Sequence, residues 1–145
     1  MFRGRSIHIL DDKGRIAIPA RFKEVLKTRG EDSLVITSEG SSLWAYRKAD
    51  WTILEEKAAR LSQFNTSGKV FLRYFISGAE ECKLKNNRIT IPKNLRREGN
   101  LTKEVVLVGE LKRFEIWDKD KWDEEFERVK AGFPAAAESL PELSI

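Results

Sequence analysis

Side chains that could carry out covalent chemistry are scarce in this chain. Its 145 residues include one cysteine, Cys82, and one histidine, His8. A Cys–His pair or a Ser–His–Asp triad would have to be built around these two side chains. A cysteine-based zinc site lacks ligands, and no phosphate-binding glycine loop of the GxxxxGK[ST] or GxGxxG type occurs. The sequence therefore predicts a protein that is not an enzyme and uses no cofactor.

Positive charge is the chemical property that the sequence does concentrate. The 27 Lys and Arg residues outnumber the 23 Asp and Glu residues, which gives a net charge of +4. Residues 1–30 carry eight basic against three acidic side chains, and residues 83–103 carry seven against one. Two such segments favour a polyanionic partner such as nucleic acid. A solvated surface without a partner is the simpler interpretation, and charge alone leaves it open.

An internal repeat places the two basic segments at equivalent positions. Arg15-Ile16-Ala17-Ile18-Pro19 recurs as Arg88-Ile89-Thr90-Ile91-Pro92, at an offset of 73 residues. The same offset relates Trp44 to Trp117. An offset shared over roughly thirty residues indicates a duplicated structural unit.

Each repeat is expected to begin with a β-hairpin. In the first repeat, Ile7 and Ile9 alternate with polar residues before the turn signal at 11–14, and Ile16 and Ile18 alternate after it. A short helix, two further strands and a longer amphipathic helix complete the unit. The predicted fold class is α+β, with β structure predominating.

The duplication also divides the chain into segments. The first repeat is assigned to residues 1–64 and the second to residues 65–130, with a polar joint between them. The closing helix of the second repeat is expected to start near Asp118, with Asp118 as its N-cap. Residues 131–145 are expected to form a flexible C-terminal tail. Since neither half can bury its apolar face alone, the two repeats should form one closed or nearly closed β structure.

Two basic hairpins at equivalent places suit a two-stranded reader of the DNA major groove. Arg15 and Arg88 each follow a turn, where a guanidinium can donate two hydrogen bonds to guanine. Asp11 is expected to orient Arg15 across the turn, although a purely structural ion pair is the alternative. The other candidate DNA contacts are Lys13, Arg3, Arg5, Lys85 and Lys83.

The chain resembles the MraZ family of bacterial regulators, which are built from two AbrB-like (SpoVT-type) DNA-binding repeats. The segments that carry the resemblance, besides the two Arg-Ile-x-Ile-Pro motifs, are Met1-Phe2-Arg3-Gly4, Arg73 with Phe75-Ile76-Ser77-Gly78-Ala79, and Val105-Val106-Leu107-Val108-Gly109 with Glu115-Ile116-Trp117. The resemblance implies a duplicated swapped-hairpin, AbrB-like barrel with short flanking helices, assembled into a homo-oligomeric ring of many subunits. It also implies binding of double-stranded DNA at short G-rich direct repeats. The implied role is repression at the promoter of the division and cell-wall gene cluster, with association with the nucleoid.

The Asp-x-x-x-Arg motif of the resembled family matches Asp11 and Arg15. In the second repeat Arg88 is kept, but Leu84 stands at the position of the acid and Asn87 at that of glycine. The first hairpin is therefore predicted to read bases, and the second to support it or to contact phosphate.

Other function classes remain open at this stage. A non-enzymatic scaffold or a peptide-binding small barrel would use the same fold, and an antitoxin-like module would need a longer tail than residues 131–145 provide. No apolar run approaches the roughly 20 residues of a membrane-spanning helix. No secretory signal is recognisable at the start of the chain. The sequence thus predicts a cytoplasmic protein without a membrane partner.

Overall fold

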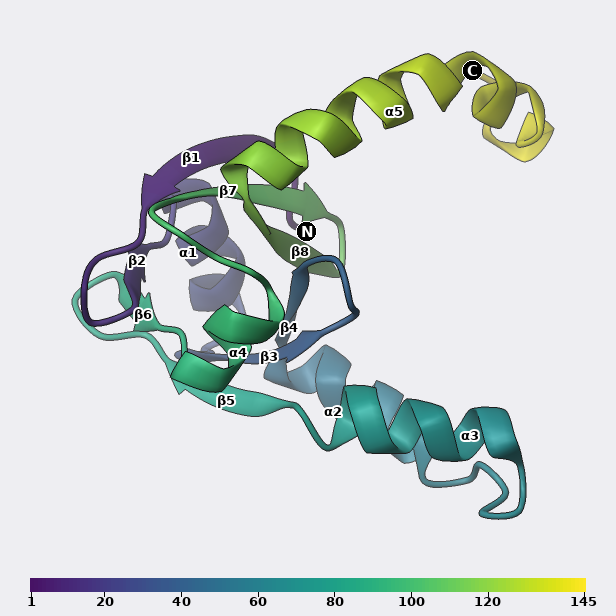
Figure 1. Ribbon diagram of the computed structural model, residues 1–145, viewed down its shortest axis with the longest axis horizontal. Coiled ribbons are helices and arrows are strands. Elements are labelled where there is room, and N and C mark those ends of the chain that lie inside the picture. The colour runs from purple at the N-terminus through teal and green to yellow at the C-terminus, as the bar shows by residue number, and fades with distance from the viewer.

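The duplication is visible in the strands of the computed structural model, which describes residues 1–145 (Figure 1). The first repeat contributes β1 (Arg5–Ile9), β2 (Arg15–Ala17), β3 (Ser33–Ser38) and β4 (Leu43–Arg47). The second contributes β5 (Glu80–Lys83), β6 (Arg88–Thr90), β7 (Glu104–Glu110) and β8 (Arg113–Asp118). The helices are α1 (Ala20–Thr28), α2 (Lys48–Ala58), α3 (Thr66–Phe71), α4 (Lys93–Glu98) and α5 (Lys119–Glu138), with a π-helical turn, η1 (Leu72–Ile76), and a 3-10 turn, η2 (Pro141–Leu143).

The two repeats exchange strands. Six strands form an antiparallel sheet in the order β1-β7-β8-β4-β3-β5, and β2 pairs with β6 in a separate ribbon. The edge strand β1 of the first repeat pairs with β7 of the second, and β5 of the second repeat pairs with β3 of the first. Neither repeat therefore has a complete sheet without the other.

A pseudo-two-fold axis relates the repeats. In the large sheet Leu43 pairs with Ile116, and in the ribbon Ile16 pairs with Ile89. Both pairs join residues that are equivalent at the offset of 73 found in the sequence. The axis therefore passes through these two pairs, and the ribbon lies on it.

The structure confirms the α+β class and the exchange of elements, but corrects three details. Helices hold 41% of the residues and strands 29%, so β structure does not predominate. The sheet is not closed into a barrel, because its edge strands β1 and β5 do not pair with each other and the ribbon β2-β6 is separate. Pro19 and Pro92 follow these strands and lack the N–H that a longer ladder would need. The strands on either side of the turn at 11–14 also do not pair as a simple hairpin, since β1 pairs with β7 and β2 with β6.

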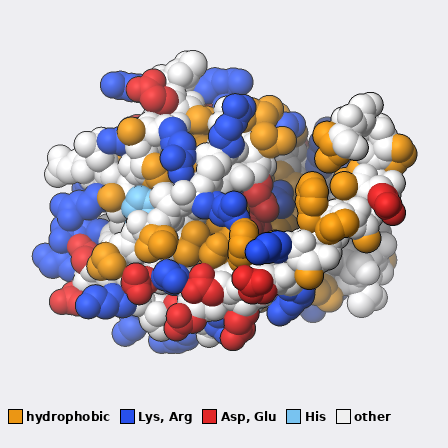
Figure 2. Space-filling model, turned by 90° about the horizontal axis from the view of Figure 1, so that it is seen from above, with side chains coloured by type: hydrophobic (Ala, Val, Ile, Leu, Met, Phe, Trp, Pro, Cys, Tyr) orange, Lys and Arg blue, Asp and Glu red, His pale blue; other side chains and the backbone are white.

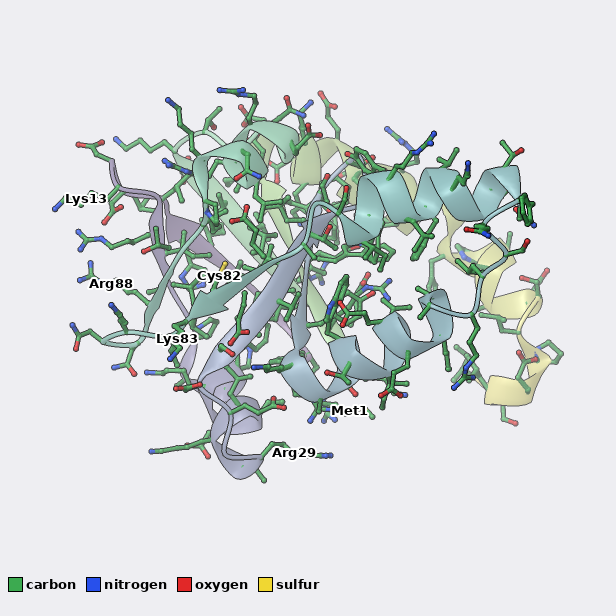
Figure 3. The ribbon with its side chains drawn as sticks, turned by 90° about the horizontal axis from the view of Figure 1, so that it is seen from below. Met1, Lys13, Arg29, Cys82, Lys83 and Arg88 are labelled. Carbon is green, nitrogen blue, oxygen red and sulfur yellow. The ribbon has the colours of Figure 1, made fainter.

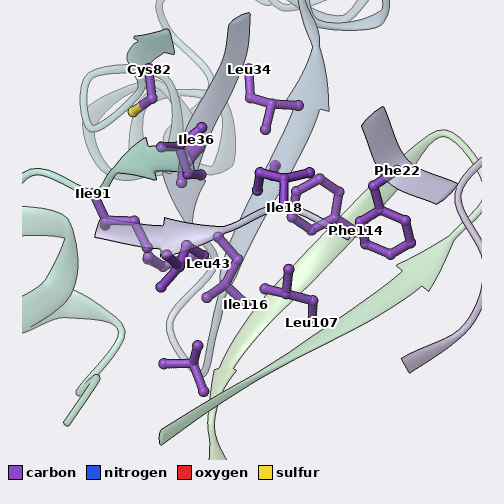
Figure 4. Packing of buried hydrophobic residues seen from close by; sticks show 14 of the residues in the cluster. Ile18, Phe22, Leu34, Ile36, Leu43, Cys82, Ile91, Leu107, Phe114 and Ile116 are labelled. Carbon is purple, nitrogen blue, oxygen red and sulfur yellow. The ribbon is translucent and has the colours of Figure 1, made fainter. Parts of the chain in front are cut away.

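The main core lies between the sheet, the ribbon and the short helices α1 and α4. Figure 4 shows Ile18 and Ile91, which follow the two ribbon strands, among side chains of the large sheet. Phe2, Phe22 and Phe114 are each fully buried and form an aromatic triad with ring centroids 4.8–5.2 Å apart. The triad joins the N-terminal segment, α1 and β8 into one packed unit.

The tryptophans lie on the outer face of the sheet, where helices cover it. Trp51 of α2 packs with Phe75, and Trp117 packs with Trp122 of α5. The carboxylate of Glu115 accepts hydrogen bonds from the indole N–H groups of both Trp44 (3.0 Å) and Trp117 (2.8 Å). These contacts hold α2 and α5 against the sheet.

The last helix differs in two ways from the sequence-based expectation. α5 begins directly after Asp118, but the Asp118 carboxylate accepts from the Thr102 hydroxyl (2.6 Å) and does not cap the helix. α5 then continues to Glu138 with Pro134 inside it, so much of the segment assigned to a tail is helical. At 20 residues it is also the longest helix of the chain. None of the helices has the length and apolar character required to cross a membrane.

One carboxyl group gives the fold a pH dependence. Burial and the neighbouring Glu115 carboxylate raise the pKa of Glu110 to about 7, although Arg113 lies 3.4 Å away. A carboxyl whose pKa is raised by folding stabilises the fold below its unfolded pKa, and this contribution is lost as the pH rises through about 7.

We therefore expect the wild type to lose stability as the pH rises from 5 to 8, and Glu110→Gln not to show this loss. The Glu110 side chain is 37% exposed, and solvent screening limits the difference to about 1–2 kcal/mol. Urea unfolding of both proteins at the two pH values measures it. Parallel pH profiles of the wild type and the variant would contradict the assignment.

Candidate nucleic-acid interface

The two predicted turns are held side by side by the ribbon. The backbone N–H of Ile91 donates to the carbonyl of Gly14 (2.8 Å), and that of Ile18 donates to the carbonyl of Asn87 (3.0 Å). Each loop is thus bonded to the strand of the other repeat. Figure 1 shows both loops projecting at the same end of the molecule, beyond β2 and β6. We refer to this end as the loop end. Backbone hydrogen bonds preorganise it.

The register of the ribbon sorts its side chains onto two faces. Ile16 and Ile89 are paired and 1% exposed, so they point into the core. Side chains alternate along a strand, and the outward face therefore carries Arg15, opposite Thr90, and Arg88, opposite Ala17. Diagonal neighbours of this kind lie roughly 7–8 Å apart. The two arginines predicted from the sequence share one exposed face, separated only by small side chains.

The two loops differ in length. In the first, the N–H of Gly14 donates to Asp11 O (3.0 Å) and the N–H of Asp11 donates to Arg15 O (3.1 Å), with Gly14 at φ +82°. This is a three-residue loop with glycine in the left-handed region. In the second, Lys85 and Arg88 exchange both backbone hydrogen bonds (2.8 and 2.9 Å) around two left-handed asparagines. Asparagine tolerates this backbone region better than other side chains.

The shorter second loop changes one assignment made from the sequence. The backbone bonds that Asp11 makes in the first loop are made by Lys85 in the second. Leu84 instead matches Leu10, because both donate a 2.8 Å hydrogen bond to a carbonyl of the opposite repeat. The expectation that Leu84 replaces the acid is therefore wrong, because a one-residue deletion shifts the register. At the acid position the second loop carries a lysine.

Asp11 and Arg15 interact as the sequence suggested. The Asp11 carboxylate accepts from the Arg15 N–H (2.8 Å), from Arg15 Nε (2.7 Å) and from the Lys13 N–H (3.0 Å). These hydrogen bonds, led by that of the Arg15 backbone, lower the pKa of Asp11 to about 2. The predicted ion pair is therefore present. Because it engages only Nε, both terminal amino groups of Arg15 remain without a protein partner.

The other candidates divide into two groups. Figure 3 shows Lys13, Lys83 and Arg88 together at the loop end, and Lys85 begins the second loop. These four side chains are exposed and form no ion pair. Basic side chains also gather at this end in Figure 2. The structure thus brings together five of the seven predicted DNA contacts.

Arg3 and Arg5 lie elsewhere. The Arg5 guanidinium lies 4.7 Å from the ring centroid of Phe126 in α5. The carbonyls of Arg3 and Arg5 accept hydrogen bonds from Arg21 (3.1 and 3.0 Å). Six residues of extended chain separate Arg5 from Asp11, which corresponds to roughly 20 Å. The structure does not place these two arginines with the loops.

Sequence inspection missed a further basic group beside the first loop. Lys93, Arg96 and Arg97 come from α4 and line a groove with Lys103 and the Asp11–Asp12 segment. The three helical residues are spaced i, i+3 and i+4, a pattern that indicates one face of a helix. That spacing could have revealed a basic helix face in the sequence. Its position beside the first loop depends on the exchange of strands between the repeats.

The two residues considered for covalent chemistry are separated. His8 lies on β1 and Cys82 on β5, at the two opposite edges of the six-stranded sheet. The Cys82 side chain belongs to the main core, and burial raises the pKa of its thiol to about 12. His8 interacts with the Ser6 hydroxyl at 2.7 Å. These positions provide no Cys–His pair.

Gly14→Ala tests whether the first loop needs its left-handed residue. A Cβ at Gly14 would lie 2.9 Å from Ile91 O and 2.7 Å from the Arg96 guanidinium carbon, at φ +82°. We expect a loss of about 1–3 kcal/mol in unfolding free energy, with weaker DNA binding. Gly132→Ala in α5, where a Cβ meets nothing within 4 Å, is the control. Equal stability of Gly14→Ala and the wild type would show that the loop relaxes without cost.

Comparison with known proteins agrees with the duplication. A family model described as "MraZ protein, putative antitoxin-like" matches residues 1–74 and 75–141. A protein named Transcriptional regulator MraZ from Syntrophobacter fumaroxidans is 52% identical over 123 residues, covering 84% of this chain and 82% of that protein. Proteins of the same name from Desulfitobacterium hafniense and Natranaerobius thermophilus are 40% and 36% identical over 146 positions, spanning all of both chains.

Proposed function

The chain belongs to the MraZ family, and on that basis we propose that it is a sequence-specific DNA-binding repressor of the promoter of the division and cell-wall gene cluster. The two repeats, residues 1–64 and 65–130, act together as one non-enzymatic DNA-binding unit that needs no cofactor. Its place is the cytoplasm, on the nucleoid.

The observation that carries this proposal is the paired presentation of Arg15 and Arg88 on the outward face of the ribbon. A two-stranded ribbon fits the major groove, which is about 12 Å wide. Arg15 donates its two free terminal amino groups to O6 and N7 of a guanine, and Asp11 holds the guanidinium in place through Nε. The hydrogen bonds around the loop fix this geometry before DNA binds, so little conformational entropy is lost on binding.

The two loops contribute differently. The first loop reads bases, because its acid orients Arg15. The second loop has Lys85 in place of the acid, and Arg88 has no carboxylate partner. An unpaired arginine flanked by Lys83 and Lys85 suits phosphate oxygens, which carry no sequence information. The second loop therefore fixes the position of the DNA, while the first selects the sequence.

Several protomers act together in the proposed mechanism. Ile7 and Ile9 of the edge strand β1 are 56% and 55% exposed, and Val129 and Phe133 of α5 are 47% and 60% exposed. Figure 2 shows hydrophobic side chains in a band beside the pale-blue His8 of β1. An exposed apolar face of this kind supports self-association into a ring of many subunits. Each loop end then engages one short G-rich direct repeat, and repeats spaced by about 10 bp face the same side of the duplex.

Titration with DNA of increasing repeat number tests the proposal. Promoter fragments that carry one, two or three G-rich repeats are compared with a scrambled fragment at near-physiological salt. Affinity is expected to rise steeply with repeat number, because tethering converts later contacts into intramolecular ones. The logarithm of the binding constant should also fall linearly with the logarithm of the salt concentration, as phosphate contacts require. An affinity that changes with neither repeat number nor salt concentration would favour a scaffold or peptide-binding role instead.

A further inference from the structure

Two grooves related by the pseudo-two-fold axis carry opposite charge. The first groove lies between the first loop and α4, and its charged lining residues are Asp11, Asp12, Lys93, Arg96, Arg97 and Lys103. The second groove lies between the second loop and α1, and its charged lining residues are Lys23, Glu24, Lys27, Glu31 and Asp32. Basic residues outnumber acidic ones by four to two in the first groove, and acidic residues outnumber basic ones by three to two in the second.

The difference arises at equivalent positions of the two repeats. Arg97 of α4 is equivalent to Glu24 of α1 at the offset of 73. Lys103 corresponds to Asp32, because their carbonyls accept the matching 2.8 Å hydrogen bonds from Leu10 and Leu84. The backbone is thus nearly symmetric around the ribbon, whereas the charge is reversed at these two pairs of positions.

The positive charge of the first groove is not used within the protein. None of its four basic side chains forms an ion pair, whereas Asp11 is already engaged by Arg15. The Nε atom of Arg96 is buried without a hydrogen-bond partner, and its guanidinium lies against Gly14 of the first loop. The groove therefore borders the base-reading loop and has free donors for an anion.

We propose that the first groove binds backbone phosphates of the DNA that flanks the sequence read by Arg15, while the acidic second groove disfavours DNA on the opposite flank. The protein then binds each recognition element in one polarity only. This inference rests on the proposed function, since it assumes that the ribbon enters the major groove.

The physical reason is a competition between two orientations. A ribbon with two-fold symmetry would dock equally well on DNA in either direction, because the duplex backbone also has local two-fold symmetry. Lys93, Arg97 and Lys103 add phosphate contacts in one direction only, and Glu24 and Asp32 repel phosphates in the other. Protomers that all bind in one polarity favour recognition elements arranged head to tail over palindromes.

The test uses two short duplexes, each with one G-rich element of the promoter and about 10 bp of flanking DNA. The flank follows the element on one duplex and precedes it on the other. The wild type is expected to prefer one duplex by roughly tenfold or more. Arg97→Gln/Lys103→Gln should abolish this preference and reduce the salt slope by about 2, at roughly 0.9 per lost phosphate contact. All of these side chains lie at the surface and outside the core.

Two matched variants complete the design. Lys23→Gln/Lys27→Gln removes two positive charges from the second groove and should keep both the preference and the salt slope. Glu24→Arg/Asp32→Lys makes the second groove basic and should raise the affinity of the disfavoured duplex to that of the favoured one. A gain of binding cannot result from misfolding. The result from this variant therefore remains informative even if the Arg97→Gln/Lys103→Gln protein is unstable.

Two results would overturn the inference. One is equal affinity of the wild type for both duplexes, and the other is equal loss of preference in the two glutamine variants. If the protein prefers the G-rich element over a scrambled one but binds both flanked duplexes with equal affinity, only this inference fails. If it shows no preference for the element at all, the proposed function fails with it.

Discussion

Under the proposed function, Arg15→Ala is expected to abolish the preference for G-rich repeats without disrupting the proposed oligomer. Arg15 has its Nε held by Asp11 at 2.7 Å, and its two terminal amino groups are free to face a guanine. Loss of a bidentate guanine contact costs about 1–3 kcal/mol per site. In an oligomer that engages several repeats the costs accumulate, so the total loss of specific affinity should exceed a hundredfold. Binding to a labelled promoter fragment and to a scrambled fragment at the same salt concentration measures it.

Arg15→Lys separates the role of the planar guanidinium from that of its charge. Lysine keeps the positive charge but cannot present two fixed donors, so specificity should fall while non-specific binding is retained. Size-exclusion chromatography of each variant checks that the assembly persists. If Arg15→Ala binds the repeats as tightly as the wild type, Arg15 is only a structural partner of Asp11. The second loop or a non-DNA partner would then become the leading candidate.

Phe114→Ala is expected to have the largest effect on stability. Phe114 is fully buried and contacts Phe2 and Phe22 with centroid distances of 5.1 and 4.8 Å. Removing a buried phenylalanine ring typically costs about 3–5 kcal/mol, from lost transfer free energy and from the cavity left behind. This cost is a large fraction of the stability of an ordinary domain. Chemical denaturation followed by tryptophan fluorescence measures the change.

Phe64→Ala provides the matched control for the same substitution. Phe64 is 88% exposed, so its truncation should change the unfolding free energy by less than about 0.5 kcal/mol. A comparable loss in both variants would show that residues 62–65 are covered in the assembled protein. A loss below 1 kcal/mol for Phe114→Ala would contradict the assignment of the aromatic triad to the core.

Much of the architecture could be predicted from local pattern. The offset of 73 between the two Arg-Ile-x-Ile-Pro segments revealed the duplication. Two further strands were predicted after the first helix of each repeat, and in the first repeat β3 and β4 follow α1 in that order. The short helix predicted between the turn and these strands is α1, which ends at Thr28. These signals are local, because side-chain periodicity reflects which face of one element is buried.

The extent of the closing elements was harder to predict. Residues 131–145 were assigned to a tail, yet α5 continues to Glu138. Asp118 precedes the helix as an N-cap residue should, but its carboxylate binds Thr102 instead. For Asp118 a contact with another part of the chain outweighed the local preference for capping. Composition does not carry this information.

The sequence was sufficient to identify a duplicated α+β protein with its basic charge concentrated next to two turns. Residue type and spacing encode these properties directly, so no tertiary information was needed. Tertiary structure decided which residues lie together. Pairing of β2 with β6 places Arg15 beside Arg88, and the exchange of strands between the repeats brings the first loop beside α4. Strand exchange depends on pairing between segments about 100 residues apart, such as Ile7 with Val106, and the hydrophobic pattern of either strand is satisfied by many partners. Only the packing of the whole chain selects one of them.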